Sequence, residues 1–452
     1  MKTRLLQVSS WLQASFWFLP GLLVLMCAAL ALGLIEMDER VTAAWIIKLP
    51  WIFSGGAEGA RGLLSAIASS IVTVTGVTFS ITVVALTLAA QQYTPRLLRE
   101  FTADRGNQLV LGTFLGTFVY SLLVLRTIRA EGFGDFVPHL AVTGGVALAI
   151  GSVALLIFFI HHVTLSLRPN SILAAITAQA EGLIDHLFPE RLGADGEQAD
   201  VPITSDPGEP GQHVRARRAG YVQTVDNQRL LRIAEENHLL VRMEVGVGEF
   251  VAADGPLLTV WPASASKRGL EAGLCGCFGV GSERTVQQDL EFAVLQIVDI
   301  AVKALSPGIN DPTTAKNCLD YLGALLQQLG SREIPSRFRR GEDGTLRVIA
   351  RGPDFDGVTR LALDDIRRYS EGTPGVTLHV IRTLAQTAAA LERPERHPVL
   401  RQQIEAIAES AEASIRRSGD LQLVSEALQE ARSHIRPPQP SVEPPAAWRK
   451  VG

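Results

Sequence analysis

Four long apolar segments in the first third of the chain constrain its fold more than any other feature. Each is long enough to cross a bilayer as a helix, which takes about 20 residues. The segments are Phe16–Ile35, Leu63–Ala90, Leu109–Leu125 and Leu140–Ile160, and no charged residue lies near the centre of any of them. We therefore expect a domain of four transmembrane helices. The lack of central charges argues against a transporter built on buried acids.

The remaining two thirds of the chain differ in composition. Overall the chain is 47% hydrophobic and 19% charged, and most of the charge follows Arg168. A typical soluble domain carries about 25% charged residues. This asymmetry predicts a membrane part followed by a soluble part. The net charge of −4 and the lack of a basic patch with interleaved aromatics favour no nucleic-acid partner.

Basic residues around the first two segments indicate the orientation. Lys2 and Arg4 precede the first segment, and Arg96, Arg99 and Arg105 follow the second. Four spans place both termini on the same side, and the positive-inside rule assigns that side to the cytoplasm. The first segment is too long for a signal-peptide core, so we expect it to be retained.

The part after Arg168 is expected to be a cytoplasmic α+β region. Short alternating strands predict a small β-sandwich or barrel module, and the later periodicity predicts a helical hairpin followed by further helices and a single strand at Thr345–Ala350. The expected organisation is a transmembrane domain at 1–168, a connecting helix and loop at 169–212, the β module at 213–262, a helical α+β domain at 263–435 and a disordered proline-rich tail at 436–452.

The four cysteines do not predict a metal site. Cys275 and Cys277 lie one residue apart in "GLCGCFGVG", without a second pair or a nearby histidine. A flexible glycine-rich linker is the preferred interpretation of this stretch. We expect no metal and no cofactor.

The second apolar segment carries a row of small and hydroxylated residues. At 3.6 residues per turn they form one stripe along the helix. Two interpretations stand: the stripe packs against a neighbouring helix, or it lines a solute pathway between subunits. The candidate pathway-lining residues are Ser69, Thr73, Gly76, Ser80, Thr87 and Gln91.

The third segment contains "GTFLGTF", which places Gly112 and Gly116 one helical turn apart. This small-xxx-small pattern predicts close packing against another helix.

The stretch Ala304–Ala315, "ALSPGINDPTTA", concentrates special residues between two predicted helices. Pro307 ends the first helix, and Gly308 is expected to take a positive φ. Asp311 and Pro312 suit the N-cap and first position of the next helix. Capping does not require Ser306 or Asn310, so a hard turn and an interface or ligand site both stay open. The candidates here are Ser306, Gly308, Asn310, Asp311 and Thr313.

Three polar residues near the start of the preceding helix are further candidates for an interface or ligand contact. They are Arg284, Gln288 and Asp289. The competing interpretation is that they are solvated first-turn residues that suit the helix dipole.

Several motifs resemble one bacterial family of predicted membrane proteins, known as domain of unknown function 2254. They are "RTVQQDLEF" and "VDIAVKALSPGINDPTTA", together with Gly76–Leu98 and "GYVQTVD". The resemblance covers the chain from the first span to about Leu391. It implies an integral inner-membrane protein with a cytoplasmic C-terminal region and supplies no activity.

We expect a homo-oligomeric channel or pore-like protein that contacts membrane lipid and carries ions or small solutes. The alternative is a membrane-anchored sensor or scaffold. An enzyme is not expected, because no G-x-S-x-G, H-E-x-x-H or P-loop motif and no paired catalytic His and Cys is found.

Overall fold

A computed structural model of the chain describes residues 17–40, 53, 55–92, 104–129, 136–166, 168–188, 210–263 and 268–435. The chain forms two compact units, Met1–Ser171 and Ile172–Gly452, which we call unit 1 and unit 2 and describe separately. The expected tail at 436–452 and most of the expected loop before the β module lie outside the described residues.

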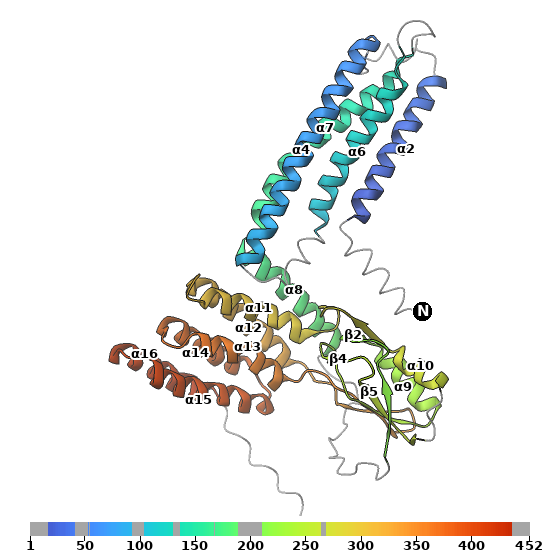
Figure 1. The fold of residues 1–452 in the computed structure, drawn as a ribbon. Helices are drawn as coiled ribbons and strands as arrows, with labels where there is room; N and C mark the ends of the chain where they lie inside the picture. Colours follow the sequence, from blue (N-terminus) through green and yellow to red (C-terminus); the bar gives the residue numbers. More distant parts are fainter. Residues whose placement is uncertain are drawn as a thin grey trace, which may run out of the picture. The chain divides into compact units, whose positions relative to one another are not determined.

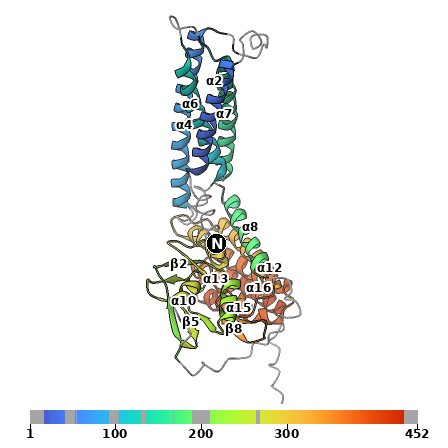
Figure 2. The same ribbon diagram turned by 90° about the vertical axis from the view of Figure 1, so that its right-hand side faces the viewer.

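Unit 1 consists of long helices that run side by side (Figures 1 and 2). Among the described residues, four helices are long and apolar enough to cross a membrane, which confirms a long apolar helix at each of the four predicted spans. They are α2 (Phe18–Arg40), α4 (Ala57–Gln92), α6 (Arg105–Thr127) and α7 (His139–Ser166).

Glycines on α6 allow α2 to approach closely. A Cβ at Gly112 would lie 2.8 Å from the backbone Cα of Pro20, and one at Gly116 would lie 2.7 Å from the Cys27 Sγ. The close packing predicted from the small-xxx-small pattern is therefore confirmed. Near the other end of α2, the Asp38 carboxylate accepts hydrogen bonds from the backbone amides of Leu140 and Ala141 at the start of α7.

Most of helix α8 (Pro169–Leu187) belongs to unit 2, which combines two sheets with a helical layer. In Figure 1 the strands lie on one side of the unit and the later helices on the other. The strands are β1 (Gln212–Arg215), β2 (Gly220–Val225), β3 (Leu240–Met243), β4 (Phe250–Val251), β5 (Pro256–Trp261), β6 (Phe278–Gly281), β7 (Phe338–Arg340) and β8 (Leu346–Ile349).

The described strands form two open sheets, not a closed barrel. One sheet has the order β1-β5-β3-β8-β7, and the other has the order β4-β2-β6. Strand β8 pairs in parallel with β3, although about 100 residues separate them in the sequence. The strand expected at Thr345–Ala350 therefore exists, and it completes a sheet that the module expected at 213–262 only begins.

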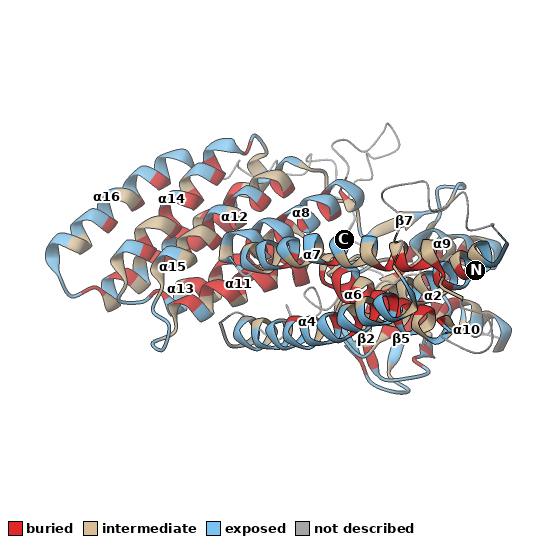
Figure 3. Cartoon of the chain, turned by 90° about the horizontal axis from the view of Figure 1, so that it is seen from above, coloured by how far each residue is buried: buried red, intermediate tan, exposed pale blue. Residues whose placement is uncertain are grey.

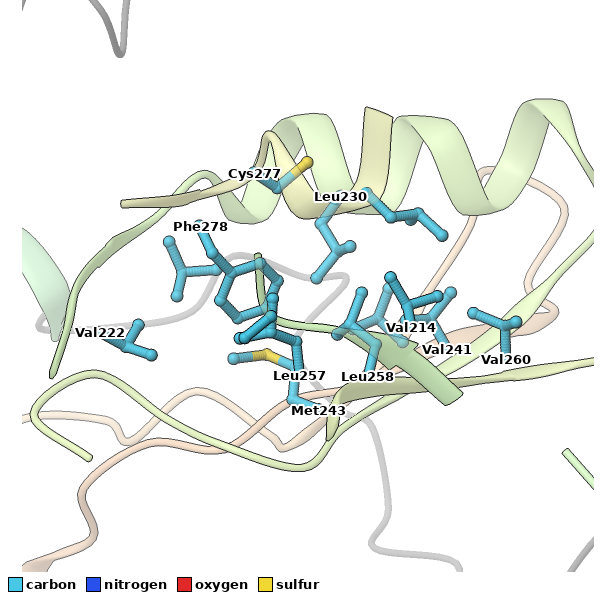
Figure 4. Packing of buried hydrophobic residues seen from close by; sticks show 14 of the residues in the cluster. Val214, Val222, Leu230, Val241, Met243, Leu257, Leu258, Val260, Cys277 and Phe278 are labelled. Carbon is cyan, nitrogen blue, oxygen red and sulfur yellow. The ribbon is translucent and has the colours of Figure 1, made fainter. Parts of the chain in front are cut away.

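One apolar cluster fills the space around these sheets (Figure 4). Helix α9 (Asn227–Glu236) contributes the fully buried Leu230. Val241 and Val260, on paired strands β3 and β5, point into the same cluster. The strands and α9 therefore share one core.

The expectation of a glycine-rich linker at "GLCGCFGVG" is wrong. This stretch ends helix α10 (Arg268–Cys275) and forms β6, which pairs with β2. Cys277 is fully buried in the core beside it, and burial raises the pKa of its thiol to about 11. Cys277 is therefore a core residue with an unreactive thiol.

The helical layer of unit 2 contains the expected helical hairpin and further helices after it. Each helix buries one face and exposes the other, as the alternating red and pale blue in Figure 3 shows. The helices are α11 (Leu290–Leu305), α12 (Pro312–Ser331), α13 (Phe355–Tyr369), α14 (Pro374–Ala390), α15 (His397–Ser414) and α16 (Ser418–His434).

Candidate functional site

The hydroxyl stripe of α4 lies on the face opposite its own bundle. Ile71 is buried against the bundle, and Ser80, nine residues later and so half a turn around the helix, is exposed. Figure 3 shows α4 largely in the colour of exposed residues. The exposed candidates are Ser69, Thr73, Gly76, Ser80 and Thr87; the side chain of Gln91 lies outside the described residues.

The hydroxyls of Ser69, Thr73 and Thr87 donate their protons to carbonyls of their own helix. Thr73 Oγ1 donates to the Ser69 carbonyl at 2.9 Å, and Thr87 Oγ1 donates to the Val83 carbonyl at 2.9 Å. These donors are satisfied within α4, so each of these exposed hydroxyl oxygens can still accept a hydrogen bond from a group outside the helix. The face of α4 outside the bundle therefore presents acceptor oxygens.

The loop between α11 and α12 is built as a tight turn. Asp311 caps α12 by accepting from the amides of Thr313 and Thr314, each at 3.1 Å, and Pro312 occupies the first turn. The predicted capping is confirmed. The hydroxyl and amide of Thr314 hold the pKa of the Asp311 carboxyl below its usual value. Thr313 itself is exposed.

Ser306 and Asn310, which capping left unexplained, have local roles in this turn. Ser306 Oγ donates to the Lys303 carbonyl at 2.6 Å, and the Ser306 carbonyl accepts from the Asn310 amide at 2.8 Å. The left-handed residue of the turn is Asn310, with φ 47°, and not Gly308 as expected. Asparagine tolerates this region because its short polar side chain bonds locally.

Arg284, Gln288 and Asp289 come together at the start of α11. Asp289 is buried and caps the helix through the Phe292 amide at 2.9 Å. Arg284 clamps it with two hydrogen bonds of 2.8 and 2.9 Å. Gln288 accepts from the Val225 amide at 2.8 Å and so ties α11 to β2.

Gly248 lies directly against this ion pair. Its φ is +85°, and a Cβ there would lie 2.4 Å from Asp289 Oδ2 and 2.7 Å from Arg284 Nη2. Only glycine suits both the backbone conformation and the space.

Gln288 and Asp289 also line a cleft of about 290 Å³. Four segments of the sequence form it: the turn after β3, the first turn of α11, Arg337 just before β7, and the stretch from β8 into α13. The charged lining residues are Glu249, Asp289, Glu291, Arg337, Arg351 and Asp354.

Three of the four cleft carboxylates are each paired with an arginine. The closest distances are 2.8 Å for Arg284–Asp289, 3.0 Å for Arg351–Glu249 and 2.5 Å for Arg337–Asp354. The Asp354 carboxylate also caps α13 through the Gly357 amide at 2.7 Å. The caps of two helices are thus fixed in the wall of one cleft.

Glu291 differs from these three carboxylates. Within the described residues its carboxyl makes no hydrogen bond and no ion pair, and the residue is half-buried. Burial raises the pKa of this carboxyl above its usual value, and the negative charges of Asp289, Glu249 and Asp354 raise it further. The Arg284 guanidinium acts in the opposite direction.

Sequence reasoning found Gln288 and Asp289 but missed Glu291, Gly248 and the three other segments that complete the cleft. Glu291 was visible in the sequence as an acidic residue in the first turn of a helix, which is common there and indicates no site by itself. Within the described ranges, no group of three or more His, Cys, Asp or Glu side chains is arranged to hold a metal ion.

The family described as "Predicted membrane protein (DUF2254)" matches residues 13–386. Uncharacterized proteins of Mycobacterium bovis and Mycobacterium tuberculosis are each 33% identical to the chain over 467 aligned positions, which cover 100% of this chain and 86% of the relative. No solved structure matches the chain.

Proposed function

Because the chain belongs to the DUF2254 family of predicted membrane proteins, we propose that it is a homo-oligomeric, channel-like protein of the bacterial inner membrane. In this proposal, α4 lines a pathway for ions or small solutes. Both termini and unit 2 lie in the cytoplasm, where unit 2 assembles the subunits and gates the pathway. The proposal assigns the protein no catalytic activity and no cofactor.

The outward position of the α4 stripe carries this proposal. A stripe turned into its own bundle would be explained by packing within one subunit. The observed stripe must instead meet lipid, another subunit or water, and acceptor oxygens favour the last two over acyl chains. A ring of such faces around a common axis would supply oxygen ligands along the length of the span.

Cross-linking tests whether the stripe faces another copy. In a background with the native cysteines replaced by alanine, Thr73→Cys should form intersubunit disulfides in membranes. Leu64→Cys, which is fully buried within unit 1, is the matched control and should not. If neither variant forms intersubunit disulfides and the protein is a monomer in detergent, the proposed homo-oligomer is refuted.

Flux measurements test the pathway itself. Reconstituted wild-type protein should pass ions or small solutes, and Ser80→Phe should reduce that flux by narrowing the pathway. The adjacent Ile81→Phe points about 100° away on the helix and should not. Wild-type protein that shows no flux under any condition refutes the channel.

A membrane-anchored sensor is the second candidate function, and the cleft of unit 2 is the observation that favours it. Ligand binding to unit 2 together with an absence of flux would select this candidate over the channel.

A further inference from the structure

The cleft of unit 2 is a cavity of the folded chain and not a feature of one loop. Its lining comes from 246–249, 288–291, 337 and 351–357. Glycines at 246, 352 and 357 keep its walls thin, and a Cβ at Gly352 would meet nothing within 4 Å. A volume of about 290 Å³ is at the lower end of the range for small-molecule sites.

Of the four carboxylates that line the cleft, three are paired with an arginine and one, Glu291, is not paired with any described residue. Glu249, Asp289 and Asp354 are each neutralised by an arginine at 3.0 Å or less. Glu291 is the fourth carboxyl, and within the described residues no basic side chain pairs with it. A half-buried carboxylate without a partner is costly, and a bound positive charge would relieve that cost.

We propose that this cleft binds a small organic cation, a compound with an ammonium or guanidinium group, and that Glu291 is its anionic contact. An ammonium or guanidinium donates strong hydrogen bonds to a carboxylate. The side chains of Arg337 and Arg351 are 60% and 52% exposed, and those of their N–H groups that do not bond Asp354, Glu249 or the Glu244 carbonyl remain for acceptor atoms elsewhere on the ligand.

A metal ion fits the cleft less well than an organic cation. The carboxylates of Glu249, Asp289 and Asp354 are already committed to arginines, and no group of three metal-ligating side chains is found in the described parts of the chain. A hard cation such as Ca²⁺ takes six to eight oxygen ligands. The cleft is also far larger than one ion.

Titration calorimetry on the full chain in an uncharged detergent tests the proposal, with 1,4-diaminobutane as the probe. We expect saturable binding at pH 8 and none with 1,4-butanediol, which has the same length and no charge. Binding should weaken as the pH falls and Glu291 takes up a proton.

Two variants locate the probe. Glu291→Gln keeps the shape and removes the charge, and it should weaken binding about 10- to 100-fold, as expected for one charge-assisted hydrogen bond. Gly352→Leu should fill part of the cleft while leaving Glu291 unchanged, and it should also weaken binding of the diamine. Glu409→Gln, on the exposed face of α15, is the matched control and should bind as wild type does.

Three results would overturn the proposal: no binding of the diamine at millimolar concentration, equal binding by the diol, or unchanged affinity in Glu291→Gln. Saturable Ca²⁺ binding that Glu291→Gln abolishes, without diamine binding, would also overturn it in favour of a metal site. None of these measurements depends on the α4 pathway, so the cleft and the channel stand or fall separately.

Discussion

The contact of Gly248 with the Arg284–Asp289 pair leads to a sharp stability prediction. Gly248→Ala adds one methyl group at a position where the backbone φ is +85°. That methyl carbon would lie 2.4 Å from Asp289 Oδ2 and 2.7 Å from Arg284 Nη2. The pair must separate, and the Asp289 cap on α11 is disturbed with it.

Two terms add in this variant. A left-handed φ costs an alanine about 1–2 kcal/mol. Breaking a buried ion pair costs about 3–5 kcal/mol, and the lower end applies because the Arg284 side chain is 22% exposed. The expected total is about 4–5 kcal/mol. Gly344 has φ +74° and nothing within 4 Å of a Cβ, so Gly344→Ala carries the first term alone, about 1–2 kcal/mol.

Amide hydrogen exchange of the full chain in detergent, followed by mass spectrometry, measures the difference. The first-turn amides of α11 should exchange about 100-fold faster in Gly248→Ala than in Gly344→Ala, which corresponds to about 3 kcal/mol. Equal exchange in the two variants would refute the reasoning, because it would leave only the backbone term and no collision with the ion pair.

Three further predictions rest on other contacts. Gly112→Ala places a methyl carbon 2.8 Å from the Pro20 Cα and should destabilise unit 1 by about 1–3 kcal/mol in thermal unfolding in detergent. A Cβ at Gly151 has no atom within 4 Å, so Gly151→Ala should leave the stability unchanged. Equal melting temperatures of the two variants would contradict this prediction. The backbone φ of Asn310 is 47°, so Asn310→Gly should leave the free energy of unfolding in urea nearly unchanged, whereas Asn310→Val should lower it by about 1–2 kcal/mol. An unchanged free energy of unfolding in Asn310→Val would contradict the predicted backbone strain. The pKa of the Glu291 carboxyl is raised in the folded chain. Between its unfolded value of about 4.3 and this raised value, the folded chain therefore binds more protons than the unfolded chain. The Glu291 carboxyl thus lowers the free energy of unfolding as the pH rises through that range. Glu291→Gln should remove that loss and melt no lower than wild type at pH 8; an unchanged pH dependence would count against the assignment.

The turn between α11 and α12 could be predicted in most of its detail because capping is a local matter. Asp311 and Pro312 act as their positions in the sequence require. The error at Gly308 has a simple origin. Either Gly308 or Asn310 can adopt a left-handed conformation, and the choice depends on the path of the chain from α11 to α12, where the Asp311 amide returns to the Ala304 carbonyl.

The stripe on α4 shows where local reasoning stops. Periodicity alone placed Ser69, Thr73 and Ser80 on one face, because helical geometry repeats regardless of context. Whether that face meets the chain's own bundle depends on how α4 packs against α6 and α7, and only the tertiary structure places it outside.

The sequence by itself therefore determined the four long apolar helices, the end of α11 and start of α12, and the close approach at Gly112 and Gly116, since each follows from composition or from neighbours within a few residues. The tertiary structure decided everything that joins distant segments. It paired β8 with β3 and brought the first turn of α11 to the loop before α13. Glu291 is an ordinary first-turn acid in the sequence. The fold places it in a cleft whose other three carboxylates are paired with the nearby Arg284 and with Arg337 and Arg351 from later in the chain, while no arginine among the described residues pairs with Glu291.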